Sequence, residues 1–231
     1  MQMEDNSILL SGIIEENITF SHTSKGATFL MVHIASKRKS GIIDHIHCMI
    51  QENLYGKNKD WIVKGVHVSL NGCIKIFRTM PGFQDYTGQK LHIYVYIDEI
   101  WETENHNDDD PSTDTISKQA ENNDGIYPDD NMVTMTGVIR DNPIFRTTPS
   151  GKEITNLIIT VPRSRVNDHF PCICWWKTAQ EAAQFQPGDK VKLTGRLQSR
   201  TYSKIIDGEK IDFETHEISV LHIGLCDNNM D

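Results

Sequence analysis

Short apolar segments with alternating polar positions recur along most of the chain, and this pattern predicts β-strands rather than helices. In residues 28–35, for example, successive side chains fall into two sets that would face opposite sides of a sheet. The strands predicted in this way are 8–14, 28–35, 45–50, 66–77 and 91–101 in the first half, and 133–139, 155–161, 170–176, 190–197 and 211–222 in the second half.

The chain runs through this order of elements twice, and each repeat has a glycine in its first and its fourth strand. Gly12 and Gly72 are separated by nearly the same number of residues as Gly137 and Gly195. Glycines at such positions suit the bends that close a small barrel. One helix is expected between the third and the fourth strand, at 179–185 in the second half.

Five strands with one helix between the third and the fourth are the pattern of an oligonucleotide/oligosaccharide-binding (OB) fold. We therefore predict an all-β protein with one short helix per domain, built from two tandem OB-fold five-stranded barrels. An unrelated small β-sandwich is the alternative. The predicted domains are 1–101, which is the more divergent, and 131–225, followed by a short tail, 226–231.

Charge supports the same division of the chain. The net charge is −9, and residues 102–130 alone contain ten acidic residues and one basic residue. This segment has almost no apolar side chains to offset the entropy of ordering it, so we predict an acidic disordered linker. A long functional loop is the alternative. The two predicted domains are close to electrically balanced, so the overall acidity does not exclude nucleic acid as a ligand.

Residues that would indicate catalysis, a metal or export are not grouped in the sequence. The five cysteines form no Cys-x-x-Cys pair, so reduced thiols are expected. No spacing indicates an acid/base pair, a nucleophile or a metal site. No apolar run reaches the ~18 residues of a membrane helix, and residues 1–11 lack the pattern of a signal peptide. We predict a cytoplasmic, non-enzymatic protein without metal or cofactor and without membrane contact.

Basic and aromatic side chains of the second half fall where loops and strand ends would line one groove. Aromatic rings stack on bases, and arginine and lysine pair with phosphates, so such a groove suits single-stranded nucleic acid. Because neighbouring strand residues face opposite sides, only one of Trp175 and Trp176 is expected to face it. The candidates are Arg140, Arg146, Arg163, Arg165, Trp175, Trp176, Lys177, Arg196, Arg200, Tyr202 and Lys204.

The first half offers a weaker set. Its third predicted strand contains no tryptophan, and it carries neither of the arginines that flank the first turn of the second half. Weaker binding, or a role in pairing with a partner, is therefore expected there. Its candidates are Lys37, Arg38 and Lys39 in one loop and Phe77 and Arg78, with Phe83 and Tyr86, in a hairpin region.

The second half also resembles a bacterial single-stranded DNA-binding protein. The resemblance covers roughly 90 residues and is carried by Arg146-Thr147-Thr148-Pro149-Ser150-Gly151, by Trp175-Trp176-Lys177 and by Gly195-Arg196-Leu197-Gln198. It implies that Trp175 and Tyr202 stack on bases and that Phe185 lies near another aromatic position of the family. It also implies four OB domains per assembly, which two domains per chain would supply as a homodimer.

This sequence lacks two features that are common in the family it resembles. The loop at 162–165 lacks the tryptophan often found there, and the sequence ends without the acidic, Phe-terminated tail by which the family recruits replication and repair proteins. The prediction is non-catalytic binding and protection of single-stranded DNA with little sequence preference, in replication, recombination or repair. The alternatives are an OB-fold protein-interaction or assembly module, such as a primosome-like accessory, and an RNA-binding protein.

Overall fold

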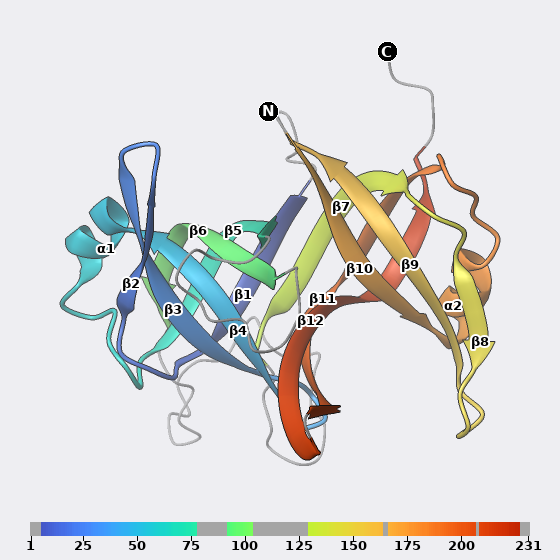
Figure 1. Cartoon of the computed structure of the whole chain (residues 1–231). Helices are drawn as coiled ribbons and strands as arrows, with labels where there is room; N and C mark the ends of the chain where they lie inside the picture. Colours follow the sequence, from blue (N-terminus) through green and yellow to red (C-terminus); the bar gives the residue numbers. More distant parts are fainter. Residues whose placement is uncertain (1–5, 78–91, 104–128, 164–165, 207, 227–231) are drawn as a thin grey trace, which may run out of the picture.

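The computed structural model describes residues 6–77, 92–103, 129–163, 166–206 and 208–226. Within these residues, twelve strands and two short helices form two barrels that lie side by side (Figure 1). The first barrel consists of β1 (Asn6–Ile14), β2 (Thr19–Ser24), β3 (Ala27–Lys37), β4 (Ile43–Gln51), α1 (Glu52–Asn58), β5 (His67–Phe77) and β6 (His92–Glu102). The second consists of β7 (Asn131–Ile139), β8 (Ile144–Thr147), β9 (Glu153–Pro162), β10 (Asn167–Trp175), α2 (Trp176–Ala182), β11 (Lys190–Ile206) and β12 (Glu209–Leu225).

Both barrels close with the same strand order. The first follows β1-β3-β4-β6-β5 and returns to β1, and the second follows β7-β9-β10-β12-β11 and returns to β7. In each barrel one neighbouring pair is parallel, β4 with β6 and β10 with β12. The additional strands β2 and β8 pair with β3 and β9 at the barrel edges. The predicted tandem of five-stranded OB-fold barrels is confirmed.

Close backbone approach explains the glycines in the fourth strand of each barrel. A Cβ atom on Gly72 would lie 2.0 Å from the carbonyl oxygen of Tyr96, and one on Gly195 would lie 2.5 Å from that of Ser219. The pairing register shifts at both glycines, beside a bulge that bends the strand. The two positions are therefore equivalent, and they align the barrels residue by residue.

The barrels are joined by pairing of their first strands. Strands β1 and β7 run antiparallel over Asn6–Leu10 and Asn131–Met135, so that all twelve strands belong to one sheet. The Asn6 side chain bonds both backbone groups of Ile74, at 2.6 and 3.0 Å, and the Asn131 side chain does the same with Leu197, at 2.7 and 2.9 Å. Ile74 and Leu197 each lie two residues after the equivalent glycines, so this contact is duplicated as well.

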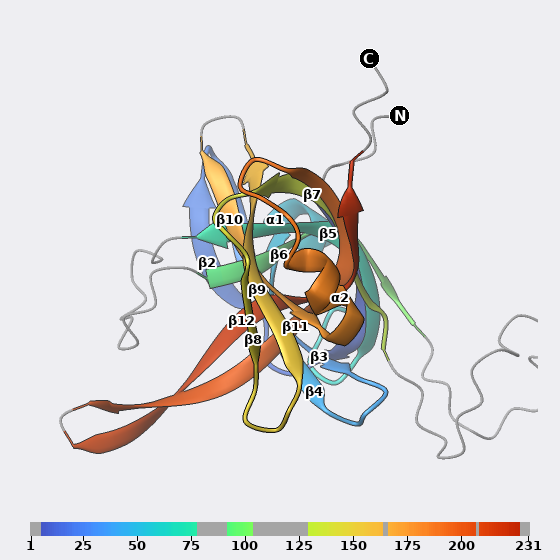
Figure 2. The same ribbon diagram turned by 90° about the vertical axis from the view of Figure 1, so that its right-hand side faces the viewer.

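The structure differs from the sequence prediction at several element boundaries. Helix α2 occupies Trp176–Ala182 instead of 179–185, because β10 ends at Trp175 and the chain turns directly into the helix. Strands β2 and β8 were not predicted, and β11 and β12 extend beyond the predicted ends as a long hairpin (Figure 2). Among the described residues, neither helix has the length and apolar composition needed to cross a bilayer.

Most of the predicted acidic linker, residues 104–128, lies outside the described residues. Its two ends contact the first barrel. Glu102 is the last residue of β6, and the Asp129 carboxylate accepts hydrogen bonds from the Lys37 backbone N–H and from His67 Nε2, both at 2.7 Å. Asp130 pairs with Ser11 through backbone and side chain. The acidic segment therefore begins and ends against the first barrel.

Candidate nucleic-acid interface

The outer face of the second barrel carries a groove of about 490 Å³ over β8, β9, β10 and β12. Alternate residues of β10 point away from the barrel core, and Pro171, Ile173 and Trp175 line the groove from that strand. Arg146 of β8 and Arg200 of β11 line it as well. The structure thus brings together three candidates from the sequence that lie up to 54 residues apart, Arg146, Trp175 and Arg200.

The charged groups of this groove are available to phosphates. Arg146 is exposed, and the Nε atom of Arg200 lies 3.5 Å from Glu217 Oε2. The Arg200 side chain is more than half exposed, and an exposed ion pair contributes little free energy. Its guanidinium can therefore exchange the carboxylate for a phosphate at small cost. Trp175 is half-buried, which leaves part of its ring open to a base.

The long β11–β12 hairpin adds a second aromatic position. The rings of Tyr202 and Phe213 lie opposite each other on the two strands, with centroids 5.6 Å apart. Lys204 Nζ lies 5.4 Å from the Tyr202 ring, and the Arg200 guanidinium lies 5.9 Å from it. The predicted candidates Arg200, Tyr202 and Lys204 are therefore one cluster. Phe213, which supports Tyr202 from behind, was not recognised in the sequence.

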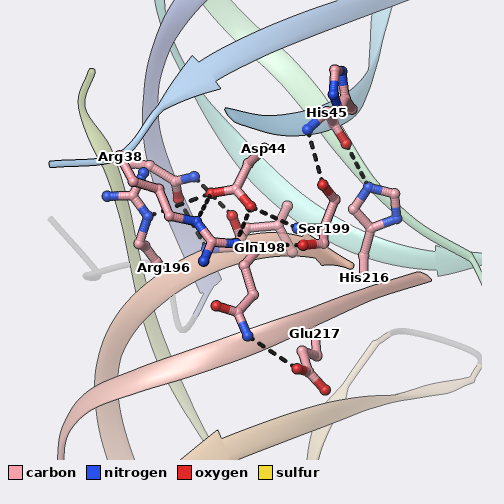
Figure 3. A network of polar contacts seen from close by, with 10 residues as sticks. Arg38, Asp44, His45, Arg196, Gln198, Ser199, His216 and Glu217 are labelled. Carbon is pink, nitrogen blue, oxygen red and sulfur yellow. Dashed lines mark hydrogen bonds and ion pairs between the residues drawn. The ribbon is translucent and has the colours of Figure 1, made fainter. Parts of the chain in front are cut away.

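Two predicted DNA contacts, Arg38 and Arg196, are instead engaged between the barrels. Asp44 is fully buried and accepts two hydrogen bonds from the Arg38 guanidinium, at 2.8 and 2.5 Å (Figure 3). Arg196 Nε lies 3.6 Å from the same carboxylate, and the backbone N–H of Ser199 donates to it at 2.9 Å. The bond to Asp44 raises the pKa of Arg38, whereas burial lowers that of Arg196. We call this group the Asp44 clamp.

Histidines extend the contact beside the clamp. The His45 backbone N–H donates to the Ser199 hydroxyl at 3.0 Å, and His216 Nε2 donates to the His45 carbonyl oxygen at 2.7 Å (Figure 3). The His47 ring lies 4.8 Å from that of His33 and 5.1 Å from that of His216. Burial, followed by the neighbouring histidines, lowers the pKa of His47 to about 3. The His47 imidazole is therefore neutral near pH 7.

The remaining second-barrel candidates lie apart from the groove. Trp176 is 55% exposed, has a left-handed backbone (φ 53°) and begins α2. Lys177 is exposed and pairs with Glu181. Phe185 packs against the hydrophobic core. Of the remaining candidates, Arg140 and Arg163 line a different cavity, between the barrels, and Arg165 lies outside the described residues.

The first barrel carries an aromatic face that sequence reasoning largely missed. The Tyr96 ring lies 5.5 Å from that of Phe29 and 5.7 Å from that of Phe77, and His22 stacks on Phe29 at 5.0 Å. Lys75 Nζ lies 4.0 Å from the Tyr96 ring. These half-buried side chains come from β2, β3, β5 and β6, and only Phe77 was a candidate. We call this group the first-barrel aromatic face.

The other first-barrel candidates are less informative. Lys37 is half-buried at the end of β3, and Lys39 is exposed in the following loop. Arg78, Phe83 and Tyr86 lie outside the described residues.

In the described part of the chain, no three His, Cys, Asp or Glu side chains are placed to share a metal ion. Burial raises the pKa of the Cys48, Cys172 and Cys174 thiols, which keeps them protonated.

Fold and site together define a class: tandem OB-fold proteins that present aromatic and basic side chains on the outer faces of their barrels. Residues 130–224 match the model of the Single-strand binding protein family. The whole chain is similar in fold to the crystal structure of wild-type single-stranded DNA binding protein from Thermus aquaticus, at 15% identity and a TM-score of 0.71, covering 98% of this chain and 95% of that one.

A deletion mutant of the Thermus aquaticus protein gives nearly the same result, with 16% identity, a TM-score of 0.70 and coverage of 98% and 96%. No curated protein matches the chain. Residues 130–224 are thus similar to the Single-strand binding protein family, which agrees with the resemblance inferred from the sequence of the second half. The two solved structures show that the chain as a whole shares their fold. Its second barrel carries the family sequence, and its full length carries the tandem-barrel fold.

Proposed function

We propose that this protein binds and coats single-stranded DNA with little sequence preference, without catalysing a reaction. The observation that carries the proposal is the groove of the second barrel, which Arg146, Trp175 and Arg200 line together. The family match of residues 130–224 supports the same function. The Tyr202 cluster and the first-barrel aromatic face are the two further contact surfaces.

The chemistry of these surfaces accounts for low sequence preference. Every base has a π-face on which an aromatic ring can stack, and every nucleotide has the same phosphate. Rings and guanidinium groups on a barrel surface therefore hold a strand without reading the edges of its bases. Such a coat protects single strands that arise in replication, recombination or repair, and we place the protein in the cytoplasm.

Assembly belongs to the same proposal. Each chain contributes two barrels, so a homodimer would present four. Light scattering of the protein with and without dT35 measures the molar mass, and a dimer mass in both states is expected. A monomer mass in both states would contradict the proposed assembly and leave the binding function standing.

Fluorescence anisotropy of labelled dT35 at several salt concentrations tests the binding function. We expect binding that weakens as salt rises, because phosphate contacts release counterions. Trp175→Ala should weaken binding about tenfold, the contribution of one base–ring stack. Trp101→Phe, at the end of β6 and outside the groove, is the matched control and should bind as the wild type does. Salt-independent affinity, or no binding, would refute the proposal.

A further inference from the structure

A second cavity, of about 550 Å³, lies between the two barrels. It continues the groove along β10, because His169 lines the cavity and the next outward residue, Pro171, lines the groove. A strand lying in the groove therefore reaches this crevice. Its lining includes Ile76 and Phe77 of β5 and, from the second barrel, Arg140, Arg163, Asp168 and His169.

The crevice contains a counterpart of the Asp44 clamp. Asp168 is the second residue of β10, as Asp44 is of β4, and each carboxylate pairs with an arginine from the loop before its strand. Arg163 Nη2 lies 2.9 Å from Asp168 Oδ1, as Arg38 lies against Asp44. Both aspartates are buried, Asp168 to 3% exposure.

The two clamps differ in one partner. At Asp44 a second guanidinium, from Arg196, approaches the carboxylate from β11 of the other barrel. Arg196 directly follows Gly195, and the residue that directly follows the equivalent Gly72 in β5 is Cys73. At the equivalent strand position the first barrel therefore carries a thiol in place of a guanidinium. Among the described residues, Asp168 has no counterpart of the ion pair that Arg196 forms with Asp44.

Both clamps contain buried polar atoms without a hydrogen-bond partner, on Arg196 at the first clamp and on Arg163 and Asp168 at the second. In the part of the chain that the structure describes, only the second clamp has a carboxylate oxygen in this position. Among the described residues, neither Asp168 Oδ2 nor Arg163 Nε has a hydrogen-bond partner, although both atoms are buried. Burial raises the pKa of Asp168, against the lowering effects of Arg163 and of the Ile76 backbone N–H. A buried carboxylate oxygen without a donor is costly, so a ligand N–H that reaches it is favoured.

The rest of the lining suits a nucleotide. The half-buried Phe77 ring, at the edge of the first-barrel aromatic face, offers a stacking surface. Arg140, with a side chain 48% exposed, offers a guanidinium whose pair with Asp141, at 3.6 Å, is weak. A ring, a cation and a buried hydrogen-bond acceptor are the three groups that hold a base, its phosphate and its polar edge.

We propose that the crevice is a nucleotide pocket in which Phe77 stacks on a base, Arg140 pairs with its phosphate and Asp168 accepts a hydrogen bond from the exocyclic amino group of that base. The pocket favours cytosine over thymine, because cytosine presents an amino group where thymine presents a carbonyl oxygen, which the carboxylate repels. This inference rests on the proposed function and adds one base-selective position to it.

The test compares the affinities for dC35 and dT35, measured by anisotropy, in wild type and variants. Asp168→Asn keeps the shape of the side chain and removes its charge. We expect it to weaken dC35 binding about tenfold, the contribution of a charge-assisted hydrogen bond, and to change dT35 binding less than about twofold. Asp60→Asn removes the same charge beside α1 and should leave the ratio of the two affinities unchanged.

A second variant supplies a competing guanidinium instead of removing the charge of Asp168. Cys73→Arg restores the guanidinium of the complete clamp, so it should lower the dC35-to-dT35 affinity ratio as Asp168→Asn does, without unfolding the protein. If Asp168→Asn changes neither affinity, or lowers both alike, Asp168 only holds Arg163 in place and the base-reading pocket is refuted. If wild type binds neither oligomer, the proposed function fails and this inference fails with it.

Discussion

The two barrels share a backbone plan and differ in what they present on their outer faces. The glycines at 72 and 195, the asparagines at 6 and 131 and the aspartates at 44 and 168 occupy equivalent positions, and all of them serve folding or the contact between barrels. The outer faces have diverged, since the second barrel combines Trp175 with exposed arginines and the first gathers aromatic rings around Lys75.

This difference separates two contributions to binding one strand. Guanidinium groups supply a salt-dependent attraction, whereas stacked rings supply a contribution that salt changes little. In the proposed function, the second barrel supplies both contributions and the first supplies mainly stacking. The two clamps also differ. At Asp44 a second arginine, Arg196, approaches the carboxylate, whereas Asp168 lines a crevice.

The largest expected effect is a difference in the free energy of unfolding between variants of the two clamps. Asp44→Asn should lower the free energy of unfolding by about 3 kcal/mol, because it leaves a buried arginine without its partner. Asp168→Asn, which affects one guanidinium instead of two, should cost about 1 kcal/mol. Urea unfolding measures both values. Equal losses would contradict the difference between the clamps, and the exposed Asp60→Asn is the control for loss of charge.

The histidine cluster gives the first barrel its own pH dependence. His47 has a pKa of about 3 when folded and about 6.5 when unfolded, so only the unfolded chain gains its proton between these values. Its contribution to stability is complete above about pH 6.5 and is lost as pH falls toward 3, by up to about 1.4 kcal/mol per pH unit.

Urea unfolding of wild type and His47→Gln at several pH values checks this expectation. The variant should show a shallower loss of stability below pH 6.5. His222→Gln, an exposed residue of β12, is the matched substitution in the second barrel and should keep the profile of wild type. Identical profiles for wild type and His47→Gln would contradict the assignment.

Removal of a ring from the first barrel tests whether that barrel binds at all. Phe29→Ala should weaken dT35 binding about fivefold to tenfold, because Phe29 lies between His22 and Tyr96 in the aromatic face. Anisotropy measures the change, and Trp175→Ala provides the comparison in the second barrel. If Phe29→Ala binds as wild type does, the first barrel serves only to position the second.

The smallest expected effect is on the salt dependence of DNA affinity, which distinguishes phosphate contacts from base stacking. Arg146→Ala should reduce the slope of log affinity against log salt by about one, as loss of one phosphate contact does. Phe29→Ala should leave the slope as in wild type while lowering affinity. A slope change in the Phe29 variant equal to that in the Arg146 variant would show that the two barrels do not divide the contributions as described.

Strand alternation was sufficient to predict the barrels, and the elements it missed have no buried face. Strand β8 is exposed at every residue, so no alternation marks it, and the extensions of β11 and β12 stand outside a barrel core. Helix α2 was placed too late because its first residue, Trp176, continues the apolar run of β10.

The candidate site was predictable where one strand or hairpin supplies several residues, as at Trp175 and Tyr202. It was not predictable where a partner lies far away in sequence. Arg38 and Arg196 looked like phosphate contacts because nothing near Arg196 in the sequence shows that both arginines meet Asp44. The first-barrel aromatic face escaped detection for a similar reason, since its rings come from four strands.

The most direct test of binding by both barrels is photochemical cross-linking of the full chain to dT35 containing 5-iododeoxyuridine, which reacts with aromatic rings that lie against the base. Peptide mapping should find adducts on Trp175 and Tyr202 of the second barrel and on Phe29, Tyr96 or Phe77 of the first. Trp61 packs against the hydrophobic core, and Trp101 lies outside the groove. Adducts confined to these two residues, or no adducts at all, would contradict the account.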